Sequence, residues 1–115
     1  MVNITGEIRW HLGEQDYAHI KFSESHGAYS IDTVVVPAKS RRQGIGKQLI
    51  GRILALADTQ DKEVYVSARP IGPTSEERLA SLVTYYERFG FRSYDRGLTV
   101  IHMKRIRASE RQSTP

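Results

Sequence analysis

Cysteine is absent from the 115 residues of this sequence, and long apolar runs are absent with it. Without thiols the chain forms neither disulfides nor thiolate metal sites, which excludes disulfide-stapled secreted domains and zinc ribbons. No apolar run approaches the ~20 residues that span a bilayer, and the amino terminus MVNITGEIRW is too polar for a secretory signal. We therefore expect a cytoplasmic protein that makes no use of a membrane.

Metal-ligand patterns and a strong excess of one charge are missing too. The four histidines show no H-E-x-x-H or comparable spacing, so we expect no metal cofactor. The formal net charge of +4 and the pI of about 9.6 favour an anionic ligand, but they fall short of a dedicated nucleic-acid-binding surface. The remaining composition is that of a globular domain, and a chain of this length builds one hydrophobic core.

The first third of the chain alternates polar and apolar residues in the strand period. Residues 4–12, 16–24 and 28–36 are rich in β-branched and aromatic side chains and are separated by polar breaks, which predicts three consecutive antiparallel strands. From Ile45 the period becomes helical, since the apolar residues fill one half of a helical wheel. An amphipathic helix packed on a sheet is therefore predicted.

A second helix is predicted between further strands. It is expected to begin at Thr74, whose hydroxyl forms a capping box with Glu77, and to end at Gly90 in the left-handed conformation. Strands are predicted over residues 63–69, 91–94 and 98–106. The order βββ-α-β-α-ββ belongs to the α+β class, with helices layered on a mixed, mostly antiparallel sheet. We expect one domain over residues 1–106 and a disordered polar tail over residues 107–115.

The segment KSRRQGIGKQL, residues 39–49, lies between the third predicted strand and the first predicted helix. Such a turn presents unpaired backbone N–H groups and the positive end of the helix dipole to an anion. Gly44 and Gly46 let the backbone approach a diphosphate closely, because they carry no Cβ. The alternative is an ordinary glycine turn with solvated basic side chains, and the segment alone leaves both readings open.

Two familiar phosphate motifs do not fit this turn. A P-loop needs serine or threonine after its lysine, but Gln48 follows Lys47. The dinucleotide-binding fingerprint needs a third glycine where Leu49 stands, and it belongs to an early βαβ unit rather than to three antiparallel strands. The turn is therefore predicted to hold a different phosphate-bearing ligand.

Residues 41–46, RRQGIG, fit the pattern [RQ]-x-x-G-x-[GA], and this segment resembles the phosphate turn of the GNAT family of N-acetyltransferases. Downstream, residues 85–91, YYERFGF, resemble the F-Y-E-K-L-G-F block of that family. The likeness covers roughly residues 28–105, with the strands and helices in the family's order. It indicates a short form without the family's first strand and two helices, similar to small phage-encoded acetyltransferases of the anti-CRISPR type.

The resemblance implies acetyl-coenzyme A as cosubstrate and a GNAT-like fold. In the family, the strand before the turn binds the pantetheine arm through its backbone, and the turn binds the pyrophosphate. Carried over by position, the pantetheine contacts fall on Val34, Val35 and Val36. The phosphate contacts fall on Arg41, Arg42, Gln43, Gly44, Ile45, Gly46 and Lys47.

The resemblance further implies that Tyr86 is the general acid for the leaving thiol, although its spacing also suits a core aromatic residue. The general base stays open among Asp32, Glu24, His26 and water. Leu79 stands where many relatives carry an asparagine, so we expect one cofactor contact to be lost or moved.

The acceptor is expected to be a primary amine, a lysine or terminus of a protein partner, because the short form leaves the acceptor side open. A second subunit in a homodimer could complete the site instead. Two other functions remain as alternatives. One is a basic nucleic-acid-binding module without catalysis. The other is a degenerate family member that binds acetyl-coenzyme A without turning it over.

Overall fold

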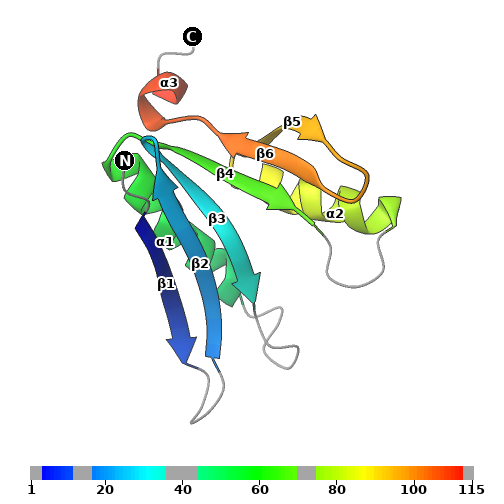
Figure 1. Ribbon diagram of the computed structural model, residues 1–115, viewed down its shortest axis with the longest axis horizontal. Helices are drawn as coiled ribbons and strands as arrows, with labels where there is room; N and C mark the ends of the chain where they lie inside the picture. The colour runs from blue at the N-terminus through cyan, green and yellow to red at the C-terminus, as the bar shows by residue number, and fades with distance from the viewer. Residues whose placement is uncertain (1–3, 12–16, 36–43, 70–74, 113–115) are drawn as a thin grey trace.

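The protein is described by a computed structural model over residues 4–11, 17–35, 44–69 and 75–112 (Figure 1). These residues form one six-stranded sheet in the order β1-β2-β3-β4-β6-β5. The strands are β1 (Ile4–His11), β2 (Tyr17–Ser25), β3 (Ala28–Val35), β4 (Glu63–Ala68), β5 (Arg92–Arg96) and β6 (Ile101–Arg105). The helices are α1 (Ile45–Thr59), α2 (Glu76–Glu87) and α3 (Ala108–Gln112). The predicted α+β class and mostly antiparallel mixed sheet are confirmed.

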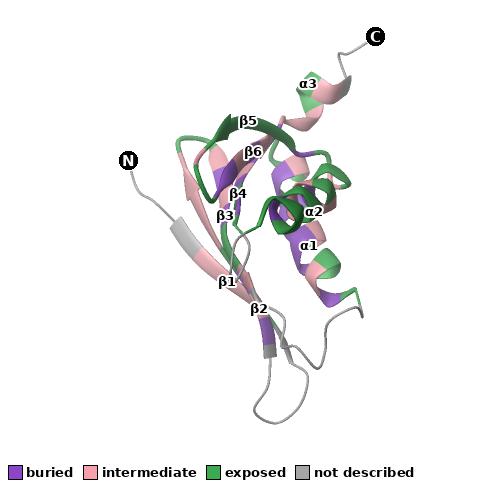
Figure 2. Ribbon diagram, turned by 90° about the vertical axis from the view of Figure 1, so that its right-hand side faces the viewer, coloured by how far each residue is buried: buried purple, intermediate pink, exposed green. Residues whose placement is uncertain are grey.

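Strands β1 to β3 form an antiparallel meander whose side chains alternate between two faces. On β2, Ala18 and Ile20 are fully buried toward the helices, whereas Lys21, the residue after Ile20, is exposed on the other face. Both α1 and α2 lie on the same side of the sheet (Figure 2). The opposite face carries no helix in the part of the chain that the structure describes, so it is open to solvent or to a partner.

Helix α1 supplies much of the core because its apolar residues recur with the helical period. Its buried residues are Ile45, Leu49, Ile50, Ile53, Leu54 and Ala57. Leu56, which the helical wheel also assigns to the apolar half, is 37% exposed at the edge of that face. Burial of the remaining residues fixes the helix against the sheet, and the amino terminus of the helix lies near the carboxyl end of β3 (Figure 1).

The single parallel contact in the described sheet, between β3 and β4, ends abruptly. It runs from Ala28 opposite Glu63 to Ile31 opposite Val66 and goes no further. At the next residue, Asp32, the register of β3 with β2 shifts by a β-bulge. A bulge bends and twists its strand, so β3 turns away from β4 at this point and the two strands diverge toward their carboxyl ends (Figure 1).

Helix α2 begins one residue later than predicted. Ser75 is the N-cap, in extended backbone conformation, and its hydroxyl accepts a hydrogen bond from the N–H of Arg78 at 3.1 Å. The cap predicted at Thr74, which lies outside the described residues, is therefore wrong by one residue, and the third residue after the observed cap is Arg78 rather than the glutamate of a capping box. Gly90 follows the helix with φ 95°, as predicted for the residue that ends it.

Strands β5 and β6 form a hairpin that is shorter than predicted on the β6 side. The N–H of Gly97 donates to the carbonyl of Val100, which closes the turn and delays β6 until Ile101. Leu98 in this turn is 97% exposed. The hairpin is tied to the start of α2 by Arg96, whose guanidinium donates to both carboxylate oxygens of Glu76 at 2.8 and 2.9 Å.

The polar tail differs from the expectation of disorder, because residues 108–112 form helix α3. Two hydrogen bonds attach it to the loop after α1: the backbone N–H and the hydroxyl of Ser109 both donate to the Asp61 carboxylate. Arg111 adds an ion pair to Asp58. These polar contacts hold α3 against the rest of the protein, although the tail has few apolar side chains that could pack on the core.

Candidate functional site

The V-shaped opening between β3 and β4 is flanked by strand edges that pair only on their outer sides (Figure 1). Beyond the bulge, β3 pairs with β2 alone, through Thr33, Val34 and Val35. Beyond Val66, β4 pairs with β6 alone, through Ser67 and Ala68. The backbone N–H and C=O groups of a strand point alternately to its two sides. Along both edges of the opening, the groups that point inward therefore have no strand partner among the described residues.

Two of the three valines predicted to bind the cofactor, Val34 and Val35, lie on the β3 edge of this opening. Val34 stands opposite Ile20 and packs its side chain against the core, while Val35 stands opposite His19. Core packing and backbone recognition are therefore compatible at Val34, because the first uses its side chain and the second its main chain. Val36 lies outside the described residues.

Helix α1 begins directly after Gly44, near the carboxyl end of β3 (Figure 1). Gly44 is the N-cap with φ 77° and ψ 11°, and no side chain caps the helix. The first turn carries no acidic residue, in contrast with α2, which has the Ser75 cap and Glu76 and Glu77. The predicted contact residues Gly44 and Lys47 are exposed, Gly46 is half-buried and Ile45 belongs to the core. Arg41, Arg42 and Gln43 lie outside the described residues.

Replacing Gly44 by alanine is expected to lower the free energy of unfolding by about 1–2 kcal/mol, because an L-residue is strained at φ 77°. Crowding is no part of this effect, since nothing lies within 4 Å of the Cβ position. Denaturant unfolding measures it. The matched control is Gly51→Ala within α1, where the Cβ position is equally empty and alanine should stabilise the helix by about 0.5–1 kcal/mol. Equal changes in both variants would contradict the conformational explanation.

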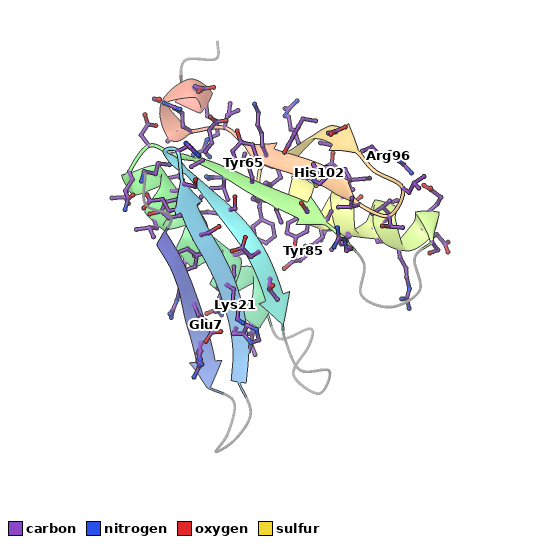
Figure 3. All side chains as sticks on the ribbon, viewed as in Figure 1. Glu7, Lys21, Tyr65, Tyr85, Arg96 and His102 are labelled. Carbon is purple, nitrogen blue, oxygen red and sulfur yellow. The ribbon has the colours of Figure 1, made fainter. Side chains whose placement is uncertain are left out.

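Tyr86, the predicted acid, lies on α2 within a group of edge-to-face aromatic rings. Its ring centroid is 5.8 Å from that of Phe91 and 5.4 Å from that of Tyr85, which in turn lies 5.2 Å from Phe89. Figure 3 shows Tyr85 beside the carboxyl end of β4, where the two strands diverge. The group places two tyrosines on the helix-covered side of the opening, one buried and one half-buried.

Burial raises the pKa of Tyr86 to about 12, with a smaller contribution from neighbouring Tyr85. Burial raises the pKa of Tyr85 as well. Tyr86 therefore stays protonated at every physiological pH and is always able to donate a hydrogen bond. The same shift makes complete proton transfer to a thiolate of pKa ~8.5 uphill by about 5 kcal/mol, against ~2 kcal/mol for an ordinary tyrosine.

The three candidate bases lie at different ends of the sheet. Glu24 forms an ion pair with Lys62, and His26 stands with φ 54° in the β2–β3 turn. Both are near the start of β3, far from the end where β3 and β4 separate (Figure 1). Asp32, by contrast, is the residue at the bulge, and its carboxylate accepts a hydrogen bond from Ser23 at 3.4 Å. Of the three, the structure brings only Asp32 to the opening.

Sequence reasoning missed a polar pair on the open face beside the opening. Ser67 Oγ and His102 Nδ1 lie 3.0 Å apart, on the adjacent strands β4 and β6. The ring of Tyr94 on β5 lies 6.3 Å from that of His102. No motif joins residues 35 positions apart; only the antiparallel pairing of Ser67 with His102 puts them together.

Several basic residues of the carboxyl-terminal part are engaged with carboxylates. Arg105 is buried and donates to both oxygens of Asp58, at 2.8 and 3.0 Å, and to the carbonyl of Phe89. Arg107 pairs with Glu63 and Glu110. These contacts neutralise a cluster that could otherwise form a nucleic-acid-binding patch.

Neither a metal centre nor a membrane segment is found in the described ranges. No group of three or more potential ligands from histidine, aspartate and glutamate occurs there. None of the described helices combines the length and the apolar character needed to cross a bilayer.

Comparison with known proteins settles the family. Residues 4–93 match the acetyltransferase (GNAT) domain. The chain belongs to the GNAT family. It is thus an N-acetyltransferase, and the family fold implies acetyl-coenzyme A as its acyl donor. No curated protein matches the sequence.

Solved structures share the fold of this GNAT chain. An acyl-CoA N-acyltransferase from Pseudomonas aeruginosa is 29% identical over 88% of this chain and 68% of its own, with a TM-score of 0.69. The anti-CRISPR protein AcrVA5 is 23% identical over 84% of this chain and 97% of its own, with a TM-score of 0.61. The PaiA N-acetyltransferase from Thermoplasma acidophilum, in complex with coenzyme A, is 12% identical over 77% and 52%, with a TM-score of 0.62.

Proposed function

We propose that this GNAT chain transfers the acetyl group of acetyl-coenzyme A to a primary amine of a protein, a lysine or a terminus. The observation that supports the site is that β3 and β4 diverge toward the end of the sheet where α1 begins after Gly44 (Figure 1). The pantetheine arm would pair with the backbone edge of Val34 and Val35, which has no strand partner among the described residues, and with Val36 beyond them. The structure of the PaiA N-acetyltransferase with coenzyme A supports a coenzyme in a protein of this fold.

The diphosphate would lie on the backbone N–H groups from Gln43 to Lys47, at the positive end of the α1 dipole. Gly44 is exposed, and nothing lies within 4 Å of the position where its Cβ would be, so a ligand can approach the backbone there. Its left-handed conformation favours glycine, which has no side chain to block that approach. Arg41 and Arg42 would add charge at its edge.

Tyr86 would donate a hydrogen bond to the sulfur as the thioester breaks. Because its pKa of about 12 disfavours complete transfer to a thiolate, stabilisation of the departing sulfur is the larger part of this role, and the proton follows as negative charge collects on the sulfur.

The attacking amine of the acceptor has to be neutral, because only the neutral form has a lone pair on nitrogen. A lysine amine of pKa ~10.4 is neutral about once in a thousand near pH 7.4, which costs ~4 kcal/mol unless a base assists.

A protein acceptor is supported by the shape of the acceptor side. The sheet face away from α1 and α2 is uncovered in the described residues, and the β5–β6 hairpin beside it exposes Tyr94 and Leu98. An open face with exposed apolar side chains fits a macromolecular surface better than a small amine, which needs an enclosing pocket. No observation comparably favours the nucleic-acid-binding alternative, because the described basic cluster is paired with carboxylates.

Calorimetric titration with acetyl-coenzyme A tests the site first, and we expect saturable binding. The protein is then incubated with labelled acetyl-coenzyme A and cell lysate, and mass spectrometry identifies the acetylated amine. Binding followed by acetylation of specific protein amines is expected. Absence of binding at millimolar ligand would refute the proposal, and binding with no acetylated product would instead identify a non-catalytic acetyl-coenzyme A-binding protein.

A further inference from the structure

The pair Ser67–His102 stands where an acceptor amine would have to arrive. Ser67 is the first residue of β4 after the last one paired with β3, Val66. It is exposed, and it alternates with Val66 and Ala68, which are buried toward the helices. Its hydroxyl therefore lies on the open face, on the opposite side of the sheet from Tyr86.

His102 is held in place on that face from two sides. Its Nδ1 lies 3.0 Å from Ser67 Oγ, and the tilted ring of Tyr94 lies beside it with the centroids 6.3 Å apart. Tyr94 in turn contacts Tyr65 edge to face, with the centroids 6.0 Å apart. An imidazole orientated by both a hydroxyl and an aromatic ring on a solvent-facing sheet is a poor contributor to the core. It is well suited to contact a ligand.

The hydrogen bond decides what the other ring nitrogen can do. In the tautomer whose Nδ1–H donates to Ser67 Oγ, Nε2 keeps a lone pair and can accept a proton. The hydroxyl remains a good acceptor after His102 takes up that proton, so the same contact supports both protonation states. Ser67 would then select the tautomer, as a positioning residue.

We propose that His102 is the base that receives the proton of the acceptor amine, with Ser67 holding its ring. This inference rests on the proposed function, because the base is needed only if acetyl-coenzyme A occupies the opening between β3 and β4. It assigns the role left open among Asp32, Glu24, His26 and water to a residue on a different strand.

The step balances without further reagents. The nitrogen lone pair of the amine attacks the thioester carbonyl carbon, the C–N bond forms and the C–S bond breaks. The amine proton passes to Nε2 of His102, directly or through one water, and the electron pair of the C–S bond leaves on the sulfur, which takes a proton from Tyr86. His102 then returns its proton to solvent, Tyr86 regains one from solvent, and the products are the N-acetylated amine and coenzyme A.

Several charged or titratable groups face His102 from the strands around it. Lys104 lies two residues along β6, Asp95 is its partner on β5, and Tyr94 contacts its ring. Tyr65 on β4 stands opposite Lys104. The pH dependence of the reaction rate would reflect the protonation of these groups as well as that of His102. The principal tests therefore measure ligand binding and the tautomer of the ring.

The first experiment uses a bisubstrate probe, in which the coenzyme A sulfur is joined through a –CH₂–CO– bridge to Nε of lysine amide. Its affinity is compared with that of coenzyme A by calorimetry. In the unaltered protein we expect the lysine arm to tighten binding about tenfold, as one good hydrogen bond to the amide N–H would. His102→Phe, which keeps a ring beside Tyr94, and Ser67→Ala should lose most of that gain while affinity for coenzyme A stays unchanged.

Ser67→Thr keeps the hydroxyl and should retain the gain. His26→Asn serves as the matched histidine control, because asparagine tolerates the left-handed backbone at that turn, and it should also retain the gain. An equal gain in His102→Phe and the unaltered protein, or no gain in the unaltered protein, would overturn the inference. Absence of coenzyme A binding would instead refute the proposed function beneath it.

The second experiment reads the tautomer directly. A long-range ¹H–¹⁵N correlation spectrum of the histidine rings, taken at alkaline pH where imidazoles are neutral, should show the His102 proton on Nδ1 in the unaltered protein and in Ser67→Thr. Ser67→Ala should shift the population toward Nε2–H. A neutral ring already protonated on Nε2 in the unaltered protein would overturn the assignment of His102 as the base, whatever the binding data show.

Discussion

Replacement of Tyr86 by phenylalanine is expected to slow acetyl transfer about 100-fold, the lower range for loss of one acid–base group. Affinity for acetyl-coenzyme A should change less than twofold. The ring packs against Phe91 and Tyr85 and is retained in the variant, so only the donor to the departing sulfur is lost. Single-turnover rates with the acceptor identified by mass spectrometry measure the chemical step, and calorimetry measures the affinity.

Tyr85→Phe is the matched control for this prediction. It removes a hydroxyl from the adjacent residue of the same helix, on a ring that contacts Tyr86. An equal rate loss in both variants would assign the effect to the aromatic group as a whole, and an unchanged rate in Tyr86→Phe would remove Tyr86 from the mechanism. Because its pKa is about 12, Tyr86 should also cause no loss of rate between pH 7 and 10.

Arg105→Met is expected to lower the free energy of unfolding by about 3 kcal/mol, more than the other substitutions proposed in this protein. This value is the lower end for breaking a buried ion pair. The guanidinium is buried and links three elements: Asp58 at the end of α1, Phe89 after α2 and its own strand β6. Its removal leaves the carbonyl of Phe89 without this donor. Asp58 is partly exposed and keeps Arg111, which limits the cost.

Denaturant unfolding at pH 7 measures the loss, which is a large fraction of the 5–15 kcal/mol typical of a small domain. The matched control is Arg92→Met on β5, an exposed arginine whose replacement should change stability by less than about 0.5 kcal/mol. A similar loss in both variants would contradict a special role for the Arg105 contacts.

The pH dependence of unfolding gives the same contacts a second test. Hydrogen bonding to Arg105 holds the pKa of Asp58 below its ordinary value. A carboxyl group with a depressed folded-state pKa stabilises the protein above its unfolded-state pKa, and this stabilisation is lost as the pH falls through the folded-state pKa. In Arg105→Met we therefore expect a shallower decline of stability on acidification below about pH 4.

Local periodicity was enough to predict most elements, because a residue's place on a strand or helix face depends mainly on its neighbours in sequence. The alternation in residues 16–24 and the helical spacing from Ile45 each gave an element that the structure confirms within a residue or two. Errors occurred where individual hydrogen bonds decide, two of them between residues three apart and one, from Ser109 to Asp61, between segments far apart in the chain. Ser75 takes the cap expected of Thr74, the bond from Gly97 to Val100 delays β6, and Asp61 binds the tail through Ser109.

The candidate site also combines features that the sequence predicts with features that depend on the fold. The glycines of residues 39–49 and the YYERFGF block are contiguous patterns, so a likeness to the GNAT family could be read from them, and the match over residues 4–93 confirms that family. The individual site residues remain predictions. The bulge at Asp32 left no sequence signal that we detected, since it depends on the register of β3 with β2.

The sequence by itself determined the order of elements up to β6, the apolar core of α1 and the family of the protein, since each is encoded in short stretches of neighbouring residues. Only the tertiary structure decided where β3 separates from β4, that Tyr86 is buried deeply enough to raise its pKa to about 12, and that Ser67 meets His102. These features depend on register and on burial between segments far apart in the chain. No local pattern records which distant residue a strand will face.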